Sequence, residues 1–172
     1  KYYGVFGYNE FVLCLGHKGD VVRNYFAIYR HLASDTLIST RYGVIEPPHA
    51  LEDWRVRLVE TGEETGTGGR IKRIEPYILG ENFLATYGDS LSDVPIDKVV
   101  EHHLKMGLPA TMCAMHSAQR FGVVKVKEGR VINFEEKPRI GSDLINGGFY
   151  VFNREVFRYL DMNGPLEYGP LS

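Results

Sequence analysis

A short apolar run that ends in an acid, residues 82–90, is the feature that most constrains how this chain can fold. Its sequence is Asn-Phe-Leu-Ala-Thr-Tyr-Gly-Asp-Ser. A run of this length closed by glycine is typical of a buried central strand in a parallel sheet. Asp89 then lies at the carboxyl end of the strand, where open α/β sheets bind ligands, and is placed to hold a metal ion over bound phosphates. The alternative is that Asp89 caps the next turn.

Length and charge limit the classes of function. The chain has 172 residues, which predicts a single domain over residues 1–172 with a sizeable core. The net charge is −2, so no basic surface indicates nucleic acid as a partner. The apolar runs are too short to span a bilayer, so we expect no membrane contact. An anionic ligand would have to meet a local cluster of cations.

The two cysteines indicate a reducing compartment. Cys14 and Cys113 each lie inside an apolar run, as small buried hydrophobic residues do. We therefore expect no disulfide. No apolar segment typical of a secretion signal follows Lys1, and we expect a cytoplasmic protein.

The order of the expected elements favours a three-layer α/β sandwich with a mixed, mostly parallel sheet and a β-hairpin insertion. Pro95 and Gly107 bound one of the helices, Asp20 is the expected N-cap of another, and the Glu128-Gly129 pair marks the hairpin turn. Strands are expected at 11–15, 55–59, 82–87, 110–115, 121–127, 130–135 and 146–152, helices at 20–33, 71–74, 96–104 and after Asn153, and a loop at 39–53.

The glycine-rich segment at residues 61–70 precedes a short helix. Glycines there let the backbone approach a ligand, and the N–H groups at a helix start favour anions, so a nucleotide is one interpretation. Arg70 and Ile71 stand where a P-loop has Lys and Ser or Thr, and Ile71 replaces the third glycine of the dinucleotide fingerprint. A flexible surface turn is the alternative.

Two other polar groups have open interpretations. Pro138 holds Glu136 and Lys137 at a strand end, where they would meet sugar hydroxyls and a phosphate, or else form a surface ion pair. His102 and His103 lie on the helix after Pro95 without a second ligand at metal spacing, and we interpret them as surface or packing residues.

Five segments together resemble the sugar-1-phosphate nucleotidyltransferases, and most closely their branch of glucose-1-phosphate cytidylyltransferases. The resemblance covers almost the whole chain and implies the Rossmann-like nucleotide-diphospho-sugar transferase fold, a homo-oligomer and a role in nucleotide-sugar supply for surface polysaccharide. The segments are Thr65-x-Thr67-Gly68-Gly69-Arg70, Tyr87-Gly88-Asp89, Arg120-Phe121-Gly122, Glu136-Lys137-Pro138 and Asn146-Gly147-Gly148-Phe149.

The resemblance also implies residue roles in a Mg²⁺-dependent reaction of CTP with glucose 1-phosphate that gives CDP-glucose and pyrophosphate. Arg70 and Lys137 would be catalytic, and Asp89 would bind the magnesium ion. The implied nucleotide contacts are Thr65, Thr67, Gly68, Gly69, Arg70 and Gly88, and the implied sugar-phosphate contacts are Gly122, Glu136, Lys137, Asn146 and Gly147. We expect the backbone at Gly68 and Gly69, the Asp89 carboxylate and the Lys137 ammonium to meet at one rim of the sheet.

Some family features have no counterpart in the sequence. The glycine-rich phosphate loop that opens such enzymes and their second metal-binding aspartate have no match, and Ser90 replaces a usual glycine. We therefore expect a domain incomplete at both ends that alone binds CTP weakly and turns over poorly. Two alternatives stay open: transfer from dTTP, UTP or GTP, and a catalytically inactive regulatory module.

Overall fold

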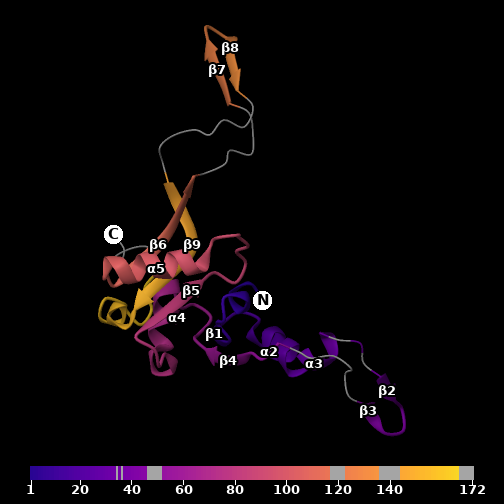
Figure 1. Ribbon diagram of the computed structural model, residues 1–172. Helices are drawn as coiled ribbons and strands as arrows, with labels where there is room; N and C mark the ends of the chain where they lie inside the picture. The colour runs from indigo at the N-terminus through magenta and orange to yellow at the C-terminus, as the bar shows by residue number, and fades with distance from the viewer. Residues whose placement is uncertain (34, 36, 46–51, 117–122, 136–143, 167–172) are drawn as a thin grey trace. The chain divides into compact units, whose positions relative to one another are not determined.

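The computed structural model describes residues 1–33, 35, 37–45, 52–116, 123–135 and 144–166 (Figure 1). Three of the predicted site residues, Gly122, Glu136 and Lys137, lie outside the described residues. The chain divides into two compact units, and each is described by itself. Unit 1 comprises Lys1–Glu81 and Arg154–Ser172, and unit 2 comprises Asn82–Asn153.

Unit 1 is built on a pair of parallel strands. β1 (Glu10–Leu15) pairs with β4 (Arg55–Glu60) in a register that runs from Glu10 opposite Arg55 to Leu15 opposite Glu60. Both strands were predicted. Parallel neighbours need a crossover connection, and α2, α3 and a short hairpin lie in it. The carboxyl ends of β1 and β4 therefore lie at the same edge.

The crossover differs from the single helix predicted for residues 20–33. α2 (Gly19–Ala27) and α3 (Tyr29–Leu32) are separated at Ile28, and nothing in the sequence marks that break. Asp20 lies in the first turn of α2 instead of capping it, because Lys18 takes the cap position with a φ of 55°. Phe26 and Tyr29 are half-buried, and Tyr25 is exposed. The Tyr29 ring lies between the rings of Phe26 and Trp54 and contacts both.

The predicted loop at 39–53 contains a strand. β2 (Leu37–Ser39) and β3 (Gly43–Ile45) form a short antiparallel hairpin, with Ser39 paired to Gly43. Gly43 has a φ of 82°, a conformation that glycine adopts without strain. The hairpin was missed because each strand has only three residues, too few to show an alternating pattern.

The rest of unit 1 packs short helices together. Its buried apolar side chains come from β1, from the residue after α4 and from the segment after β9: Leu15, Ile74, Val156, Phe157, Leu160 and Leu166. The segment after β9 is also bonded to α4, since Lys72 Nζ donates to the Phe157 carbonyl oxygen at 2.7 Å. The helices are α1 (Tyr2–Val5), α4 (Thr67–Arg73) and the 3₁₀ helices η1 (Glu75–Tyr77) and η2 (Arg154–Arg158).

Unit 2 is a three-stranded antiparallel sheet with β9 (Leu144–Asn153) in the middle. β9 pairs with β5 (Asn82–Thr86) on one side and with β6 (Ala110–His116) on the other. The five residues 148–152 of β9 are buried, whereas β5 is only half-buried or exposed. The central strand of this sheet is thus β9, and not β5 as the apolar run at 82–90 led us to expect.

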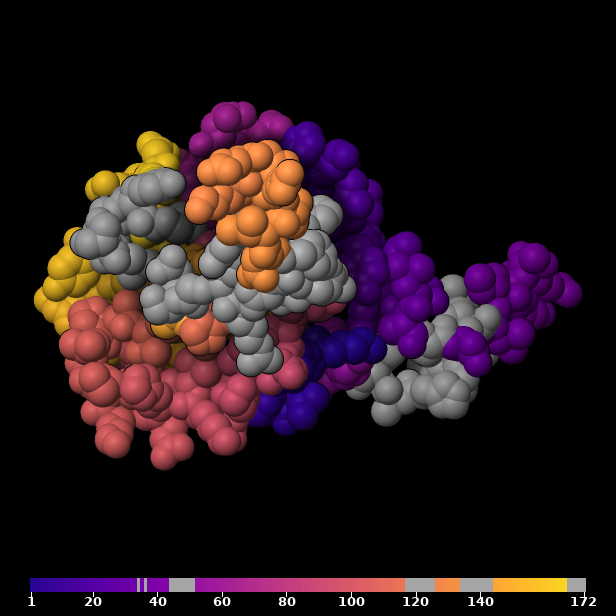
Figure 2. All heavy atoms as spheres, turned by 90° about the horizontal axis from the view of Figure 1, so that it is seen from above, coloured from indigo at the N-terminus to yellow at the C-terminus, as the bar shows by residue number. Residues whose placement is uncertain are grey.

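The α5 helix (Ile96–Met106) forms as predicted. Pro95 occupies its N-cap, and Gly107 ends it with a φ of 63°. The helix contacts β6 and β9, and its exposed side, drawn in salmon, is visible in Figure 2. The last predicted helix, after Asn153, is the 3₁₀ helix η2, and Asn153 itself belongs to β9.

The predicted hairpin insertion is also confirmed. β7 (Val123–Lys127) and β8 (Arg130–Glu135) pair antiparallel, and the turn residues Glu128 and Gly129 have φ values of 50° and 77°. Positive φ at both central residues is the signature of a type I′ turn, whose twist suits a two-residue hairpin.

The balance of strand directions differs from the predicted mostly parallel sheet. Among the described strands, β1 with β4 is the parallel pairing, and the other four pairings are antiparallel. The α/β class itself is confirmed, because strands and helices alternate along much of the chain.

Candidate functional site

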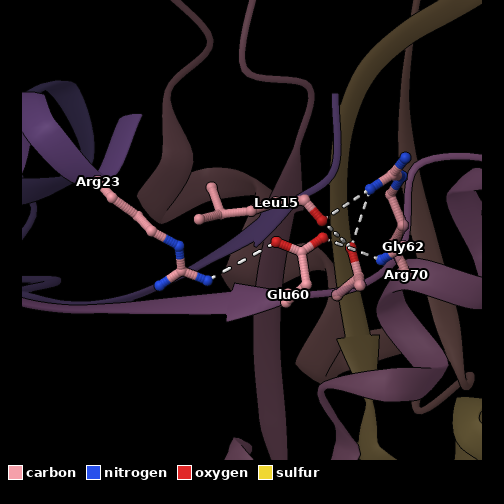
Figure 3. A network of polar contacts seen from close by, with 6 residues as sticks. Leu15, Arg23, Glu60, Gly62 and Arg70 are labelled. Atoms are coloured by element: carbon pink, nitrogen blue, oxygen red, sulfur yellow. Dashed lines mark hydrogen bonds and ion pairs between the residues drawn. The ribbon is translucent and has the colours of Figure 1, made fainter. Parts of the chain in front are cut away.

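The carboxyl ends of β1 and β4 carry a buried polar network centred on the carbonyl oxygen of Leu15 (Figure 3). This oxygen accepts from the Thr61 N–H at 2.8 Å, from the Thr61 hydroxyl at 2.7 Å and from Arg70 Nη1 at 3.1 Å. Thr61 is fully buried, so these bonds satisfy groups that water cannot reach. The network fixes the edge where the two strands end.

Arg70 links three parts of this edge. Besides Leu15, its guanidinium donates to Thr61 Oγ1 at 2.9 Å and to the Glu63 carbonyl oxygen at 2.9 Å. Gly16 passes so close that an added Cβ would lie 2.6 Å from Arg70 Nη1. Arg70 was predicted to contact the nucleotide and to act in catalysis, and its contacts here show that it also holds the strand ends. A guanidinium has five N–H donors, so these bonds leave room for an anion.

The Glu60 carboxylate holds the turn that follows β4. Its Oε1 accepts from the Gly62 N–H at 3.3 Å, and its Oε2 lies 3.7 Å from Arg23 Nη2 of α2 (Figure 3). Gly62 has a φ of 87°, which favours glycine at this turn. Glu60 and Arg23 were not predicted as part of the site, and no motif singles them out.

The glycines of the 61–70 segment pack against the chain itself. α4 begins at Thr67, so Gly68 and Gly69 lie inside the helix and not before it. An added Cβ would meet the Pro165 carbonyl oxygen at 2.9 Å from Gly68 and the Met162 carbonyl oxygen at 2.6 Å from Gly69. The N–H groups of Gly66 and Gly69 donate to the Asn163 and Gly164 carbonyl oxygens.

These contacts occupy two of the N–H groups that the segment was expected to offer to an anion, those of Gly66 and Gly69. In the structure the glycines allow α4 to approach the 162–166 segment, which was not foreseen. The predicted nucleotide contacts of Gly68 and Gly69 remain predictions, and they would have to use the other sides of these residues. Thr67 also serves this packing, since its hydroxyl accepts from the Leu166 N–H at 2.8 Å. Thr65 is buried at the same edge, 9% exposed.

Arg73 and His17 are two further polar residues near this edge, and both were missed from the sequence. Arg73 donates to the Thr61 carbonyl oxygen at 2.9 Å and to Asn163 Oδ1 at 2.7 Å. His17 Nδ1 lies 2.7 Å from Glu63 Oε1, and both side chains are exposed. The basic run at the end of α4 was visible in the sequence but does not reveal these partners.

In unit 2, two of the five segments that carried the family resemblance meet. The turn at residues 87–90 follows β5, and Thr86 pairs with Phe149, which places the turn beside the 146–148 segment. An added Cβ on Gly148 would lie 2.8 Å from the Tyr87 ring and 3.4 Å from Ser90 Oγ. Gly88 and Asp89 are both exposed. The turn that carries the predicted metal ligand Asp89 and the segment that carries the predicted sugar contacts Asn146 and Gly147 are thus neighbours within one sheet.

A chain of hydrogen bonds organises this meeting point. Asn146 Oδ1 accepts from the Gly148 N–H at 2.8 Å, and Asn146 Nδ2 donates to Tyr150 Oη at 2.6 Å. Tyr150 Oη lies 3.0 Å from Tyr87 Oη. Gly147 packs closely on β6, since an added Cβ would lie 2.8 Å from the Cys113 carbonyl oxygen. Tyr150 was missed because its position in an apolar strand looks like a core residue.

Asp89 could supply one carboxylate ligand to a magnesium ion. Mg²⁺ usually takes one or two carboxylates and completes its coordination with substrate phosphates and water, so one exposed carboxylate at a strand end is compatible with it. Within the described ranges, no group of three or more His, Cys, Asp and Glu side chains is arranged to hold a metal. The role of Asp89 as a magnesium ligand therefore remains a prediction.

His103 is a packing residue, as predicted. It is 2% exposed, and its Nε2 lies 3.2 Å from Asn82 Oδ1 while its Nδ1 lies 2.9 Å from Thr111 Oγ1. Burial lowers the pKa of His103 below its usual value. Asn82 Oδ1 only accepts, so Nε2 carries the proton and the neutral ring accepts from Thr111 through Nδ1.

Both cysteines are free thiols. Cys14 and Cys113 are half-buried, and burial raises the pKa of Cys14 to about 11 despite the nearby Arg70. Burial also raises the pKa of Cys113. A thiol with a raised pKa is a poor nucleophile at neutral pH, so neither cysteine has the environment of a reactive residue. None of the helices that the structure describes is long and apolar enough to cross a bilayer.

Comparison with known proteins gives the family. A family profile described as Nucleotidyl transferase matches residues 45–169. The chain is 39% identical to a glucose-1-phosphate cytidylyltransferase of Salmonella typhimurium over 94% of its own length and 63% of that protein. It is 35% identical to a probable glucose-1-phosphate cytidylyltransferase of Bacillus subtilis over 95% of its length and 64% of that protein. The chain thus spans just under two thirds of the length of these curated relatives.

Solved structures show the same fold. HddC from Yersinia pseudotuberculosis superposes with a TM-score of 0.65 at 20% identity, over 97% of this chain and 66% of that one. An apo UDP-glucose pyrophosphorylase superposes with a TM-score of 0.53 at 17% identity, over 96% of this chain and 69% of that one. These likenesses confirm the predicted α/β nucleotide-sugar transferase fold, and with the profile match over most of the sequence they lead to one conclusion: the chain belongs to the nucleotidyl transferase family.

Proposed function

We propose that the protein transfers a cytidylyl group from CTP to glucose 1-phosphate, giving CDP-glucose and pyrophosphate. The names of the Salmonella and Bacillus relatives support this substrate pair. The observation that carries the proposal within this chain is the meeting of the 87–90 turn with the 146–148 segment, beside which Asp89 is exposed. Because the chain covers only part of these relatives, the activity is proposed for the intact protein.

The reaction is an in-line displacement without a covalent enzyme intermediate. An oxygen of the sugar phosphate forms a bond to the α-phosphorus of CTP, and the bond from that phosphorus to the bridging oxygen breaks, so that pyrophosphate leaves with the electron pair. The enzyme's contribution is to position the two anions and to neutralise charge. A bound Mg²⁺ would supply part of that neutralisation, and members of this family generally use a divalent metal.

Different residues of the chain would bind the two substrates. Asp89 would hold the metal, and Asn146 and Gly147 would contact the sugar. Arg70, Thr65 and Thr67 would face the nucleotide, with Gly68, Gly69 and Gly88. The Lys137 ammonium would meet the sugar phosphate, together with Gly122 and Glu136, and these three residues remain predictions from the resemblance alone.

The nucleotide base is the first point to test. A relative named D-glycero-alpha-D-manno-heptose 1-phosphate guanylyltransferase from Aneurinibacillus thermoaerophilus is 29% identical over 88% of this chain and 57% of its own length, which keeps a guanine nucleotide as the competing candidate. We expect CTP to outcompete UTP, dTTP and GTP in transfer to glucose 1-phosphate by the intact protein. Preferred incorporation of GMP would replace the cytidylyl proposal with a guanylyl one.

An inactive regulatory module is the alternative from another class. Substituting Asp89→Asn removes the exposed carboxylate with little change in volume. Under the enzyme proposal, pyrophosphate release falls at least about 100-fold, in line with the loss of a metal ligand or its support. Asp97→Asn, an exposed carboxylate on α5, is the matched control and should keep wild-type turnover. Equal rates in both variants would argue against a catalytic role for Asp89.

The cytoplasmic location and the homo-oligomer stay predictions. Size-exclusion chromatography with light scattering on the intact protein measures the oligomeric state directly. A monomer at micromolar concentration would contradict the expectation.

A further inference from the structure

The Asn146 amide is held in one orientation by groups that the family resemblance did not include. Its Oδ1 accepts from the Gly148 N–H, and its Nδ2 donates to Tyr150 Oη at 2.6 Å. The side-chain amide is therefore anchored at both ends. An amide that is flipped by 180° would present a carbonyl oxygen where it now presents a donor.

Tyr150 is fixed more firmly than Asn146. Its ring is 2% exposed and stacks on Phe152 with the centroids 5.4 Å apart, while Asn146 is exposed. The Tyr150 hydroxyl also lies 3.0 Å from the Tyr87 hydroxyl. Tyr87 directly precedes Gly88 and Asp89 in the sequence. The buried ring thus provides the fixed point, and the exposed amide is the group that it orients.

We propose that Tyr150 is a positioning residue for sugar-phosphate binding, which acts by orienting the Asn146 amide through its phenolic oxygen. This inference rests on the proposed function, because it gives Asn146 a sugar hydroxyl as its ligand. An amide nitrogen carries two N–H groups, so Asn146 keeps one donor beyond the bond to Tyr150. The exposed amide can give that donor to a hydroxyl of a hexose 1-phosphate.

Tyr150→Phe in the intact protein tests the proposal, because it removes one oxygen and keeps the buried ring. The KM for the sugar phosphate should rise about three- to tenfold, the usual effect of a lost hydrogen bond of this kind, while the KM for the nucleotide stays within twofold. Tyr159→Phe is the matched control, since Tyr159 is 56% exposed. An unchanged KM for the sugar phosphate in Tyr150→Phe would overturn the proposal.

A double variant separates positioning from a general structural effect. If Tyr150 acts through Asn146, then Asn146→Ala and the Asn146→Ala/Tyr150→Phe pair should have the same KM for the sugar phosphate. Multiplying effects would overturn the proposal, because Tyr150 would then act independently of the amide. The midpoint of thermal unfolding of each variant shows whether the fold is retained.

A readout without turnover distinguishes this inference from the proposed function. If the wild-type protein transfers no nucleotide from CTP, UTP, dTTP or GTP, the proposed function fails. High-resolution crystal structures of the wild type and of Tyr150→Phe then still test the orientation step. Rotation or disorder of the Asn146 amide in the variant would support the positioning role of Tyr150, and an unmoved amide would overturn it.

Discussion

At the scale of single residues, Gly148 shows how backbone conformation and packing can require the same amino acid. Its φ is 75°, in the left-handed region that side chains disfavour, and the space for a Cβ is filled by the Tyr87 ring. Two independent constraints therefore keep glycine where β9 passes the turn after β5.

Gly148→Ala should lower the free energy of unfolding by about 2–4 kcal/mol, because the left-handed conformation and the 2.8 Å approach to the Tyr87 ring both oppose the added methyl group. Urea unfolding of the intact protein measures the change. Gly88→Ala is the control, since nothing lies within 4 Å of its Cβ position, and it should change stability by less than about 0.5 kcal/mol. Equal effects of the two substitutions would contradict this account.

Arg70 could stabilise the strand ends, contact the nucleotide, or do both. Substituting it in the absence of any ligand separates these roles. Arg70→Ala should cost about 1–3 kcal/mol of stability without any ligand present, because the bonds to Leu15, Thr61 and Glu63 are lost. Arg158→Ala breaks the exposed ion pair with Glu155 and should cost less than about 1 kcal/mol. Chemical unfolding of both variants tests this, and a stable Arg70→Ala protein would assign Arg70 to ligand contact alone.

At the scale of elements, packing against the 162–166 segment determines which residues α4 can contain. Helix propensity alone favours alanine over glycine by about 1 kcal/mol at an interior position. At Gly69, however, an added Cβ would lie 2.6 Å from the Met162 carbonyl oxygen, and backbone cannot move aside as a side chain can. Packing therefore outweighs propensity in this helix.

Gly69→Ala should accordingly destabilise the protein by about 2–4 kcal/mol, the opposite sign to that expected from propensity. Limited proteolysis should also show faster cleavage near residues 162–166, because the segment can no longer lie against α4. A stabilised Gly69→Ala protein would mean that α4 and this segment separate readily.

His103 joins three elements of unit 2 through Asn82 of β5 and Thr111 of β6. Its pKa is lowered by burial, so below pH 6.5 the unfolded chain binds a proton that the folded protein does not. Stability should therefore be complete above about pH 6.5 and fall as the pH decreases toward the folded-state pKa.

Denaturant unfolding at pH 7.5 and at pH 5.5 measures this acid sensitivity. His103→Gln should reduce the difference between the two pH values, even where it lowers stability at both. His102→Gln is the control, because His102 is exposed on the same helix and should leave the difference unchanged. Identical pH dependence in the wild type and His103→Gln would contradict the assignment.

At the scale of the whole molecule, the proposed chemistry depends on a divalent metal, whose coordination one carboxylate such as that of Asp89 would share with substrate phosphates and water. Chelation with EDTA should abolish nucleotidyl transfer, and added Mg²⁺ should restore it. The Asp89→Asn variant should need a higher Mg²⁺ concentration for half-maximal rate. Full activity in EDTA would contradict both the metal dependence and the role of Asp89.

Local signals predicted much of this molecule. Pro95 and Gly107 marked the ends of α5, and the Glu128-Gly129 pair marked the β7–β8 turn, because both signals come from the intrinsic backbone preferences of a few adjacent residues. Of the site, the structure brings the 87–90 turn and the 146–148 segment side by side, and these are two of the segments that carried the family resemblance.

Contacts between residues far apart in the sequence could not be predicted from local sequence patterns. The partners of Gly68 and Gly69 lie almost a hundred residues further along the chain, so their packing role had no local trace. The same holds for the contact of Tyr150 with Tyr87, because Tyr87 lies 63 residues earlier in the chain, in the turn after β5. The common rim of Gly68, Gly69, Asp89 and Lys137 remains a prediction.

The central place of β9 has a consequence for biosynthesis. A ribosome makes β5 and β6 before β9, yet both strands pair with β9. The nascent chain must therefore carry two unpaired strand edges until residues 144–153 have left the exit tunnel, and it is during this interval that chaperones have an aggregation-prone segment to protect.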